Sequence, residues 1–251
     1  MSGPDSRDWV VLPTYNEREN LGLIVPRIRA AVAGATILVV DDGSPDGTGE
    51  LADRMAAADS HVRVLHRTAK EGLAKAYAAG FATALDGGAD RVVQMDSDGS
   101  HDPAVLPAFL TLLAQDADLV LGSRYVRGGR TVDWPLLRQL VSVGGNLFSQ
   151  AVLWLPYRDL TGGFKAWRAG LLRQVDPATI QASGYVFQVE MTWRAHRAGA
   201  RIREVPITFR ERTVGESKMS GGIFFEAARE VLRMRLTGPR TSRDKDAGRG
   251  S

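Results

Sequence analysis

The stretch Arg91-Val92-Val93-Gln94-Met95-Asp96-Ser97-Asp98 decides how this chain is interpreted. Residues 92–95 form a short apolar run with two β-branched valines, which predicts a buried strand. Asp96 and Asp98 then place two carboxylates one residue apart where the chain turns out of the strand, so both can reach one cation. Such oxygen ligands suit Mg²⁺ or Mn²⁺. An isolated pair of this kind is more often a solvated turn, so the metal hypothesis depends on its surroundings.

Outward from this stretch, strand and helix patterns alternate. Apolar, β-branched runs occur at 9–12, 36–40, 62–66, 91–95 and 118–122, and helical patterns at about 20–32, 47–58 and 72–85. This alternation predicts an α/β fold with a mostly parallel central sheet and helices on both faces. Further helices are expected at about 136–155, 186–198 and 222–236, with a strand at about 202–210. We expect one domain over 9–236, a flexible N-terminus over 1–8 and a disordered tail over 237–251.

Composition limits the classes of function. The 251 residues are 44% hydrophobic and 24% charged, as in an ordinary folded protein. There is no cysteine, so a metal must be held by oxygen or histidine ligands. The net charge of +3 does not require nucleic acid. We see no secretory signal and no apolar run of the roughly 18–20 residues that a membrane span needs. These features favour a cytoplasmic protein.

Two other predicted strands also end in polar residues. Pro13-Thr14-Tyr15-Asn16-Glu17 follows the first strand, which the proline is expected to stop, and Asp41-Asp42-Gly43-Ser44-Pro45-Asp46-Gly47 follows the second. Ligands of such sheets bind at the carboxyl ends of the strands. Tyr15 can stack on a base, and Glu17 or Asp42 can accept hydrogen bonds from a nucleoside. Each segment alone is also an ordinary turn or helix cap. Together with the Asp96–Asp98 pair, they predict a nucleotide-diphosphate site.

Basic residues occur where phosphates would need them. Arg124 follows the strand predicted at 118–122, and Arg210, Arg212 and Lys218 lie in or near a Gly- and Ser-containing segment that could close over a donor. A solvated basic loop is the commoner use of such a cluster. The sequence lacks both a P-loop and a Gly-x-Gly-x-x-Gly turn after the first strand, which disfavours P-loop ATPases and dinucleotide dehydrogenases.

These motifs resemble the inverting family 2 glycosyltransferases of GT-A fold, and more narrowly the polyprenol (dolichol) phosphate mannose synthases. The resemblance runs from about residue 9 to residue 236. The motifs that carry it, besides the first two polar strand ends, are Asp96-x-Asp98-x-Ser100-His101, Gly122-Ser123-Arg124-Tyr125, Thr161-Gly162-Gly163-Phe164, Phe187-Gln188-Val189-Glu190-Met191 and Gly215-Glu216-Ser217-Lys218. The family often has alanine at the position of Ser97, which we expect to contribute through its backbone.

The resemblance implies a set of site residues. Asp96, Asp98 and Ser100 would hold Mg²⁺ or Mn²⁺, and Arg124, Arg138 and Ser142 would contact the acceptor phosphate. The catalytic residues implied are Asp98, Arg124 and Arg138. The residues implied to bind the nucleotide sugar are Pro13, Tyr15, Glu17, Val40, Asp42, Asp96, Ser97, Asp98, Arg124, Arg212 and Lys218.

The reaction implied is transfer of mannose from GDP-mannose to a polyprenyl phosphate with inversion, at the cytoplasmic face of a membrane with which the chain associates peripherally. A membrane protein is a plausible recruiting partner, and no nucleic acid is expected. The anionic acceptor needs no strong general base, so we interpret Glu190 as an orienting group, with a structural ion pair as the alternative. The predicted helices 136–155 and 222–236 are both candidates for lipid contact, and equally for ordinary amphipathic packing.

Three alternatives stay open on the sequence alone. A polyprenyl-phosphate glucosyltransferase using UDP-glucose would share the donor site. A transferase acting on a soluble or polysaccharide acceptor would need a real catalytic base, which Gln188-Val189-Glu190 does not supply. A non-catalytic nucleotide-binding subunit would not need Asp96, Asp98, Arg124 and Lys218 together.

Overall fold

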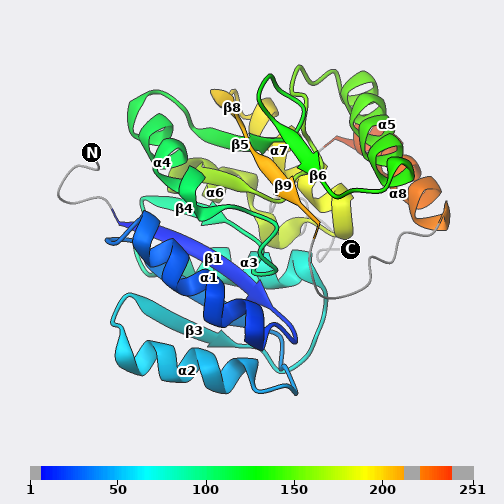
Figure 1. Cartoon of the computed structure of the whole chain (residues 1–251). Helices are drawn as coiled ribbons and strands as arrows, with labels where there is room; N and C mark the ends of the chain where they lie inside the picture. The colour runs from blue at the N-terminus through cyan, green and yellow to red at the C-terminus, as the bar shows by residue number, and fades with distance from the viewer. Residues whose placement is uncertain (1–6, 212–220, 239–251) are drawn as a thin grey trace, which may run out of the picture.

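A computed structural model describes residues 7–211 and 221–238. Its centre is a seven-stranded sheet in the order β3-β2-β1-β4-β7-β5-β8 (Figure 1). The strands are β1 (Asp8–Thr14), β2 (Thr36–Asp41), β3 (Val62–His66), β4 (Arg91–Gln94), β5 (Leu119–Ser123), β7 (Lys165–Arg168) and β8 (Ile202–Pro206). Every neighbouring pair is parallel except the two that involve β7. The predicted mostly parallel α/β sheet is therefore confirmed.

Helices cover both faces of this sheet. The strands carry apolar side chains on both faces, so each face has to be shielded from water. One face packs against α1 (Arg18–Ala31), α2 (Thr48–Ala58) and α4 (Leu106–Gln115). The other packs against α3 (Leu73–Asp86), α6 (Ala169–Val175) and α7 (Gly184–Arg197). Short 3₁₀ turns occupy Pro103–Val105 and Pro177–Thr179. The two buried layers make β1, β2 and β4 rigid supports for whatever lies at their carboxyl ends.

The second half of the chain adds a separate layer beside the sheet. A two-stranded parallel sheet pairs β6 (Arg130–Val132) with β9 (Thr208–Arg210), and α5 (Leu136–Leu153) packs with α8 (Gly221–Thr237) and α7 around a third apolar cluster (Figure 1). Within the described residues, no helix combines the length and apolarity that crossing a bilayer requires.

The structure corrects several predicted boundaries. The strand expected at 202–210 is two strands in different sheets, because pairing passes from β5 to β6 beyond Pro206. The sequence pattern also missed β6, β7 and α6, which are short and carry no alternation of their own. Of the expected terminal segments, residues 1–6 and 239–251 lie outside the described residues.

Pro13 does not stop the first strand. β1 continues to Thr14, and Pro13 is in register with Val40 of β2. Its nitrogen, which cannot donate, faces the β4 side of the strand, where the β1–β4 register ends at Val11. On that side its carbonyl accepts from Ser97 Oγ at 2.9 Å. The proline therefore costs no ladder hydrogen bond, as is usual for a proline at an unpaired strand position.

Candidate active site

The three polar strand ends lie together at the carboxyl edge of the sheet. Ser97 Oγ donates to Pro13 O, and Thr14 Oγ1 donates to Asp41 Oδ1 at 3.4 Å, linking the segments after β4, β1 and β2. Asn16, at a positive φ of 59°, donates its amide to Ser44 Oγ at 3.0 Å. These contacts assemble one polar rim from residues more than 80 positions apart.

Asp96 and Asp98 form an oxygen-rich turn at this rim. Tyr77 donates its hydroxyl to Asp96 Oδ1 at 2.6 Å, and the Ser100 amide donates to Asp98 Oδ1 at 3.1 Å. Ser100 Oγ is buried and has no hydrogen-bond partner among the described residues. An unused hydroxyl beside two carboxylates fits a hard divalent cation. The described residues include no group of three His, Asp or Glu side chains that could hold a metal, so the remaining ligands would come from water and phosphates.

His101 holds the backbone of this turn. Its Nδ1 accepts from the Asp96 amide at 3.1 Å, and its ring stacks on Phe164 with centroids 4.7 Å apart. Burial lowers the pKa of His101, outweighing the opposite influence of Asp96 and Asp98. A neutral imidazole is consistent with Nδ1 acting as an acceptor. The motif placed His101 near the metal residues, but only the structure shows that it acts on the Asp96 backbone.

The rim after β2 and β1 contains cations that the sequence did not single out. Arg67 donates to Asp42 Oδ1 at 2.5 Å, and Lys70 Nζ lies 3.8 Å from the centroid of the Tyr15 ring. Burial raises the pKa of Asp42, even though Arg67 opposes that shift. Arg67 and Lys70 follow β3, the strand beside β2, so the topology brings them to the same end of the rim as Asp42 and Tyr15.

Two residues implied to bind the nucleotide already have side-chain contacts within the protein. Val40 is fully buried in the apolar layer under α3, so only its backbone could contact a ligand. Glu17 accepts from Asn20 Nδ2 at 2.6 Å through Oε2. Arg212 and Lys218 lie outside the described residues.

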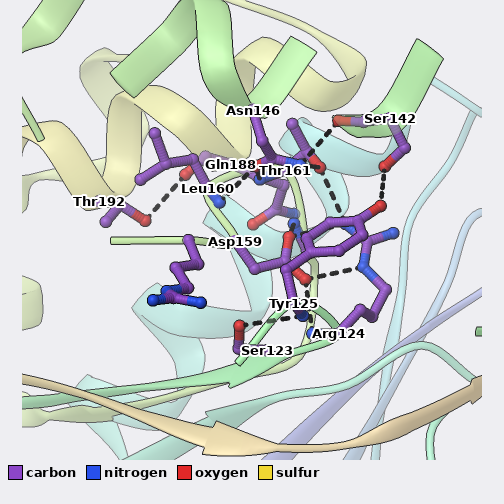
Figure 2. A network of polar contacts seen from close by, with 12 residues as sticks. Ser123, Arg124, Tyr125, Ser142, Asn146, Asp159, Leu160, Thr161, Gln188 and Thr192 are labelled. Atoms are coloured by element: carbon purple, nitrogen blue, oxygen red, sulfur yellow. Dashed lines mark hydrogen bonds and ion pairs between the residues drawn. The ribbon is translucent and has the colours of Figure 1, made fainter. Parts of the chain in front are cut away.

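Arg124, which was expected at the rim, is buried and paired with a carboxylate. It is 6% exposed, and its Nε and Nη2 each donate to Asp159 at 2.7 Å (Figure 2). Nη2 also donates to Thr161 at 2.8 Å. Burial by itself would lower the pKa of Arg124, but Asp159 raises it. No motif in the sequence pointed to Asp159, which reaches Arg124 from the segment before β7.

The residues proposed for the acceptor phosphate lie beside this ion pair. Tyr125 donates its hydroxyl to Ser142 Oγ of α5 at 2.7 Å. Asn146, also in α5, donates to Thr161 at 3.1 Å (Figure 2). Arg138 donates to Glu211 and lies over the Trp134 ring. Arg138 and Ser142 therefore lie one turn apart on α5. Tyr125, the neighbour of Arg124, contacts this helix at Ser142.

An apolar stripe begins at the same end of α5. We define it as the exposed apolar residues of that helix, which are Leu136, Leu137, Leu140, Val143 and Leu147. The first three are at least 70% exposed. Large apolar side chains that gather on one exposed surface commonly mark an interaction site. Here the surface lies next to the residues proposed for the acceptor phosphate.

A buried polar network lies beneath the site. Gln94 donates to Gln188 Oε1 at 2.8 Å, and Lys165 Nζ donates to Gln188 O at 2.7 Å and to Thr192 Oγ1 at 3.0 Å. Burial lowers the pKa of Lys165 from 10.5 to about 7. No motif in the sequence pointed to Lys165, because its burial follows from the central place of β7 in the sheet.

Glu190 makes the structural ion pair that was the alternative to an orienting group. Arg194, one helical turn further along α7, donates to Glu190 Oε1 through Nε at 3.0 Å and Nη2 at 2.6 Å. Both side chains are largely buried, and Arg194 also donates to Thr179 Oγ1 at 2.6 Å. Glu190 thus holds α7 together in the described structure.

The sequence of this chain is similar to those of known glycosyltransferases. The model of glycosyl transferase family 2 matches residues 9–176. The chain is 53% identical to an undecaprenyl-phosphate mannosyltransferase of Micrococcus luteus, over 92% of this chain and 94% of that protein. It is 48% identical to a polyprenol monophosphomannose synthase of Mycolicibacterium smegmatis, over 94% and 89%.

Solved structures show the same fold. Glucosyl-3-phosphoglycerate synthase from Mycobacterium tuberculosis, in complex with Mn²⁺ and UDP-glucose, aligns with a TM-score of 0.64 at 22% identity, over 94% of this chain and 81% of that one. The fold is GT-A, as predicted. The chain belongs to glycosyl transferase family 2.

Proposed function

We propose that this family 2 glycosyltransferase transfers mannose from GDP-mannose to a polyprenyl phosphate, with inversion, giving β-mannosyl phosphoryl polyprenol and GDP. The observation that carries the proposal is the meeting of three features at one place. The oxygen-rich turn at Asp96 and Asp98 suits a metal-bound diphosphate, Arg124 and Arg138 suit a second phosphate, and the apolar stripe of α5 suits a lipid chain. The names of the two bacterial relatives support the acceptor and the sugar.

The donor would lie along the polar rim. In this proposal Tyr15, Glu17 and Asp42 contact the nucleoside through their side chains. Pro13, Val40 and Ser97 contact the donor through their backbones, along the edge where Pro13 is in register with Val40 and accepts from Ser97. Arg212 and Lys218 are proposed to contact the donor phosphates. Asp96, Asp98 and Ser100 would hold Mg²⁺ or Mn²⁺, which when bound neutralises charge on the departing diphosphate.

The acceptor phosphate is its own nucleophile. A phosphate monoester carries close to two negative charges at pH 7, so no base is needed to activate it. The protein's task is to hold this anion near another anion, and guanidinium groups do so with paired N–H donors. The engagement of Glu190 by Arg194 agrees with a site that works without a carboxylate base. We place the enzyme at a cytoplasmic membrane surface, where its acceptor would be embedded.

The direct test is transfer of radiolabelled mannose from GDP-mannose into organic-extractable polyprenyl phosphate. We expect label with Mg²⁺ or Mn²⁺ and none with EDTA. Asp98→Asn keeps the size of the side chain but removes its charge, and should lower transfer at least about a hundredfold. Asp86→Asn, at the exposed end of α3, is the matched control and should retain activity.

Other outcomes separate the alternatives. If label is transferred from UDP-glucose but not from GDP-mannose, the proposed donor is wrong and the proposed acceptor still holds. If Asp98→Asn transfers mannose at the rate of the unmodified enzyme, the proposed metal site at this turn is wrong. Binding of GDP without transfer from any donor to any lipid would leave a non-catalytic subunit.

A further inference from the structure

Trp134 lies against both arginines of the proposed acceptor site. The guanidinium carbon of Arg138 is 4.2 Å from the centroid of the Trp134 ring, and that of Arg124 is 5.3 Å from it. Trp134 is 8% exposed, and its carbonyl accepts from Gln139 Nε2 at 3.1 Å at the start of α5. One indole therefore contacts two cations that come from different elements, the segment after β5 and the first turns of α5.

Phe209 of β9 joins this indole to the turn that carries the carboxylates. Its ring meets Trp134 edge-on with centroids 5.3 Å apart, and His101 in the same manner at 5.4 Å. His101 in turn accepts from the Asp96 amide. A continuous series of ring contacts thus connects the Asp96 turn to Arg124 and Arg138.

The packing explains how the arginines keep edges for a ligand. A guanidinium that stacks on an aromatic face still has its N–H groups in the plane, directed sideways toward carboxylate or phosphate oxygens. Arg124 donates to Asp159 from Nε and Nη2, and Arg138 donates to Glu211 from Nη1. Among the described residues, Arg124 Nη1 and Arg138 Nη2 have no hydrogen-bond partner, so each arginine keeps a donor for a ligand. The Trp134 Nε1 donor is buried without a hydrogen-bond partner among the described residues, so ring packing, rather than a hydrogen bond of its own, fixes the indole.

We infer that Trp134 is a positioning residue that holds Arg124 and Arg138 as one phosphate-binding pair and so determines affinity for the acceptor. This inference rests on the proposed function, because it assigns the pair to the acceptor phosphate. Without the indole, two long cationic side chains regain rotamer freedom, and each ligand must pay for ordering them. The ring of Trp134 contacts Arg124, Arg138 and Phe209, and none of the residues proposed for the nucleoside, so their contacts should persist.

The experiment compares Trp134→Phe and Trp134→Leu with the unmodified enzyme. Leucine fills space without an aromatic face, and phenylalanine keeps a face. We expect Trp134→Leu to raise KM for polyprenyl phosphate about tenfold, while KM for GDP-mannose and kcat stay within about twofold. Trp134→Phe should recover most of the acceptor affinity. A merely structural role would not split the two KM values in this way.

Trp9→Leu is the matched control. Trp9 is 2% exposed and has the guanidinium carbon of Arg63 at 5.0 Å from its ring centroid, but it lies near the start of β1, away from the site. Thermal melting should show that both leucine variants fold. Equal acceptor KM values in Trp134→Leu and the unmodified enzyme, or matching losses in Trp134→Leu and Trp9→Leu, would overturn the inference.

A failure of the proposed function is recognised separately, as absence of transfer by the unmodified enzyme. Calorimetric titration of farnesyl phosphate then decides the inference without turnover. Binding by the unmodified protein that weakens about tenfold in Trp134→Leu would support it. No binding, or equal binding by both, would overturn it.

Discussion

At the scale of single residues, Lys165 is a buried group whose ionisation is coupled to folding. Its Nζ donates to two oxygens of α7, the carbonyl of Gln188 and the hydroxyl of Thr192, and neither of these carries a charge. Burial lowers its pKa from 10.5 to about 7, Asp159 opposes the shift, and Arg124 adds to it. Between those two pH values the unfolded chain binds a proton here that the folded chain does not. Raising the pH across this window therefore stabilises the folded state.

Lys165→Met should abolish this dependence. From pH 7 to pH 9.5 we expect the free energy of unfolding of the unmodified protein to rise by about 3 kcal/mol relative to the variant. Urea denaturation of both proteins at the two pH values measures the difference. Lys75→Met, at an exposed position of α3, should follow the unmodified protein. A constant difference between Lys165→Met and the unmodified protein would show that Lys165 does not titrate in this window.

At the scale of elements, α5 has two faces with different partners. Asn146, Ser149 and Leu153 are buried toward the protein, and α8 packs beside the helix. The apolar stripe faces away, and Leu147 is 59% exposed. Such a helix can lie in the surface of a membrane with its apolar side chains inserted. Of α8, the side chains of residues 221–225 lie outside the described residues, so the predicted role of Ile223, Phe224 and Phe225 stays a prediction.

Leu140→Ser with Leu147→Ser places two hydroxyls on the stripe, seven residues apart. We expect binding to vesicles, measured by co-sedimentation, to fall at least about tenfold, because two exposed leucines lose their apolar transfer energy. Transfer to a short, water-soluble polyprenyl phosphate should persist. Leu23→Ser, a 68% exposed leucine of α1, is the control and should bind as before. An equal loss in that control would assign the effect to general surface polarity.

At the scale of the whole molecule, the site is shared by both halves of the chain. The family 2 match ends at residue 176, yet β8 completes the seven-stranded sheet, and β9 pairs with β6 and carries Phe209, which packs on Trp134. Binding of the proposed donor with its metal would therefore raise the stability of the entire domain, because a ligand that binds only the folded state raises the unfolding midpoint.

GDP-mannose with Mn²⁺ should raise the midpoint by several degrees when present at about a hundred times its dissociation constant. UDP-glucose with Mn²⁺ should raise it less, and EDTA should remove the shift while leaving the ligand-free midpoint unchanged, since protein donors already hold Asp96 and Asp98. Differential scanning fluorimetry measures all three. A larger shift with UDP-glucose would contradict the proposed donor.

The sequence by itself determined the parallel strands β1 to β4, their helices, and the grouping of polar strand ends. These features follow from local periodicity and from the rule that parallel strands share a carboxyl edge. It did not anticipate β6 or β7, whose short segments depend on neighbours for their hydrogen bonds. Periodicity describes what a segment prefers, and a three- or four-residue strand has too few residues to express a preference.

The tertiary structure alone decided which charges are paired. Arg124 was expected to contact a phosphate, and the fold pairs it with Asp159. Glu190 was interpreted as an orienting group, with a structural ion pair as the alternative, and the fold pairs it with Arg194. Lys165 and Trp134 became relevant only through the residues packed around them. Burial and ion pairing depend on side chains that are distant along the chain, so no local pattern encodes them. The chemistry available at each strand end is local, and the electrostatic state of each group is a property of the whole fold.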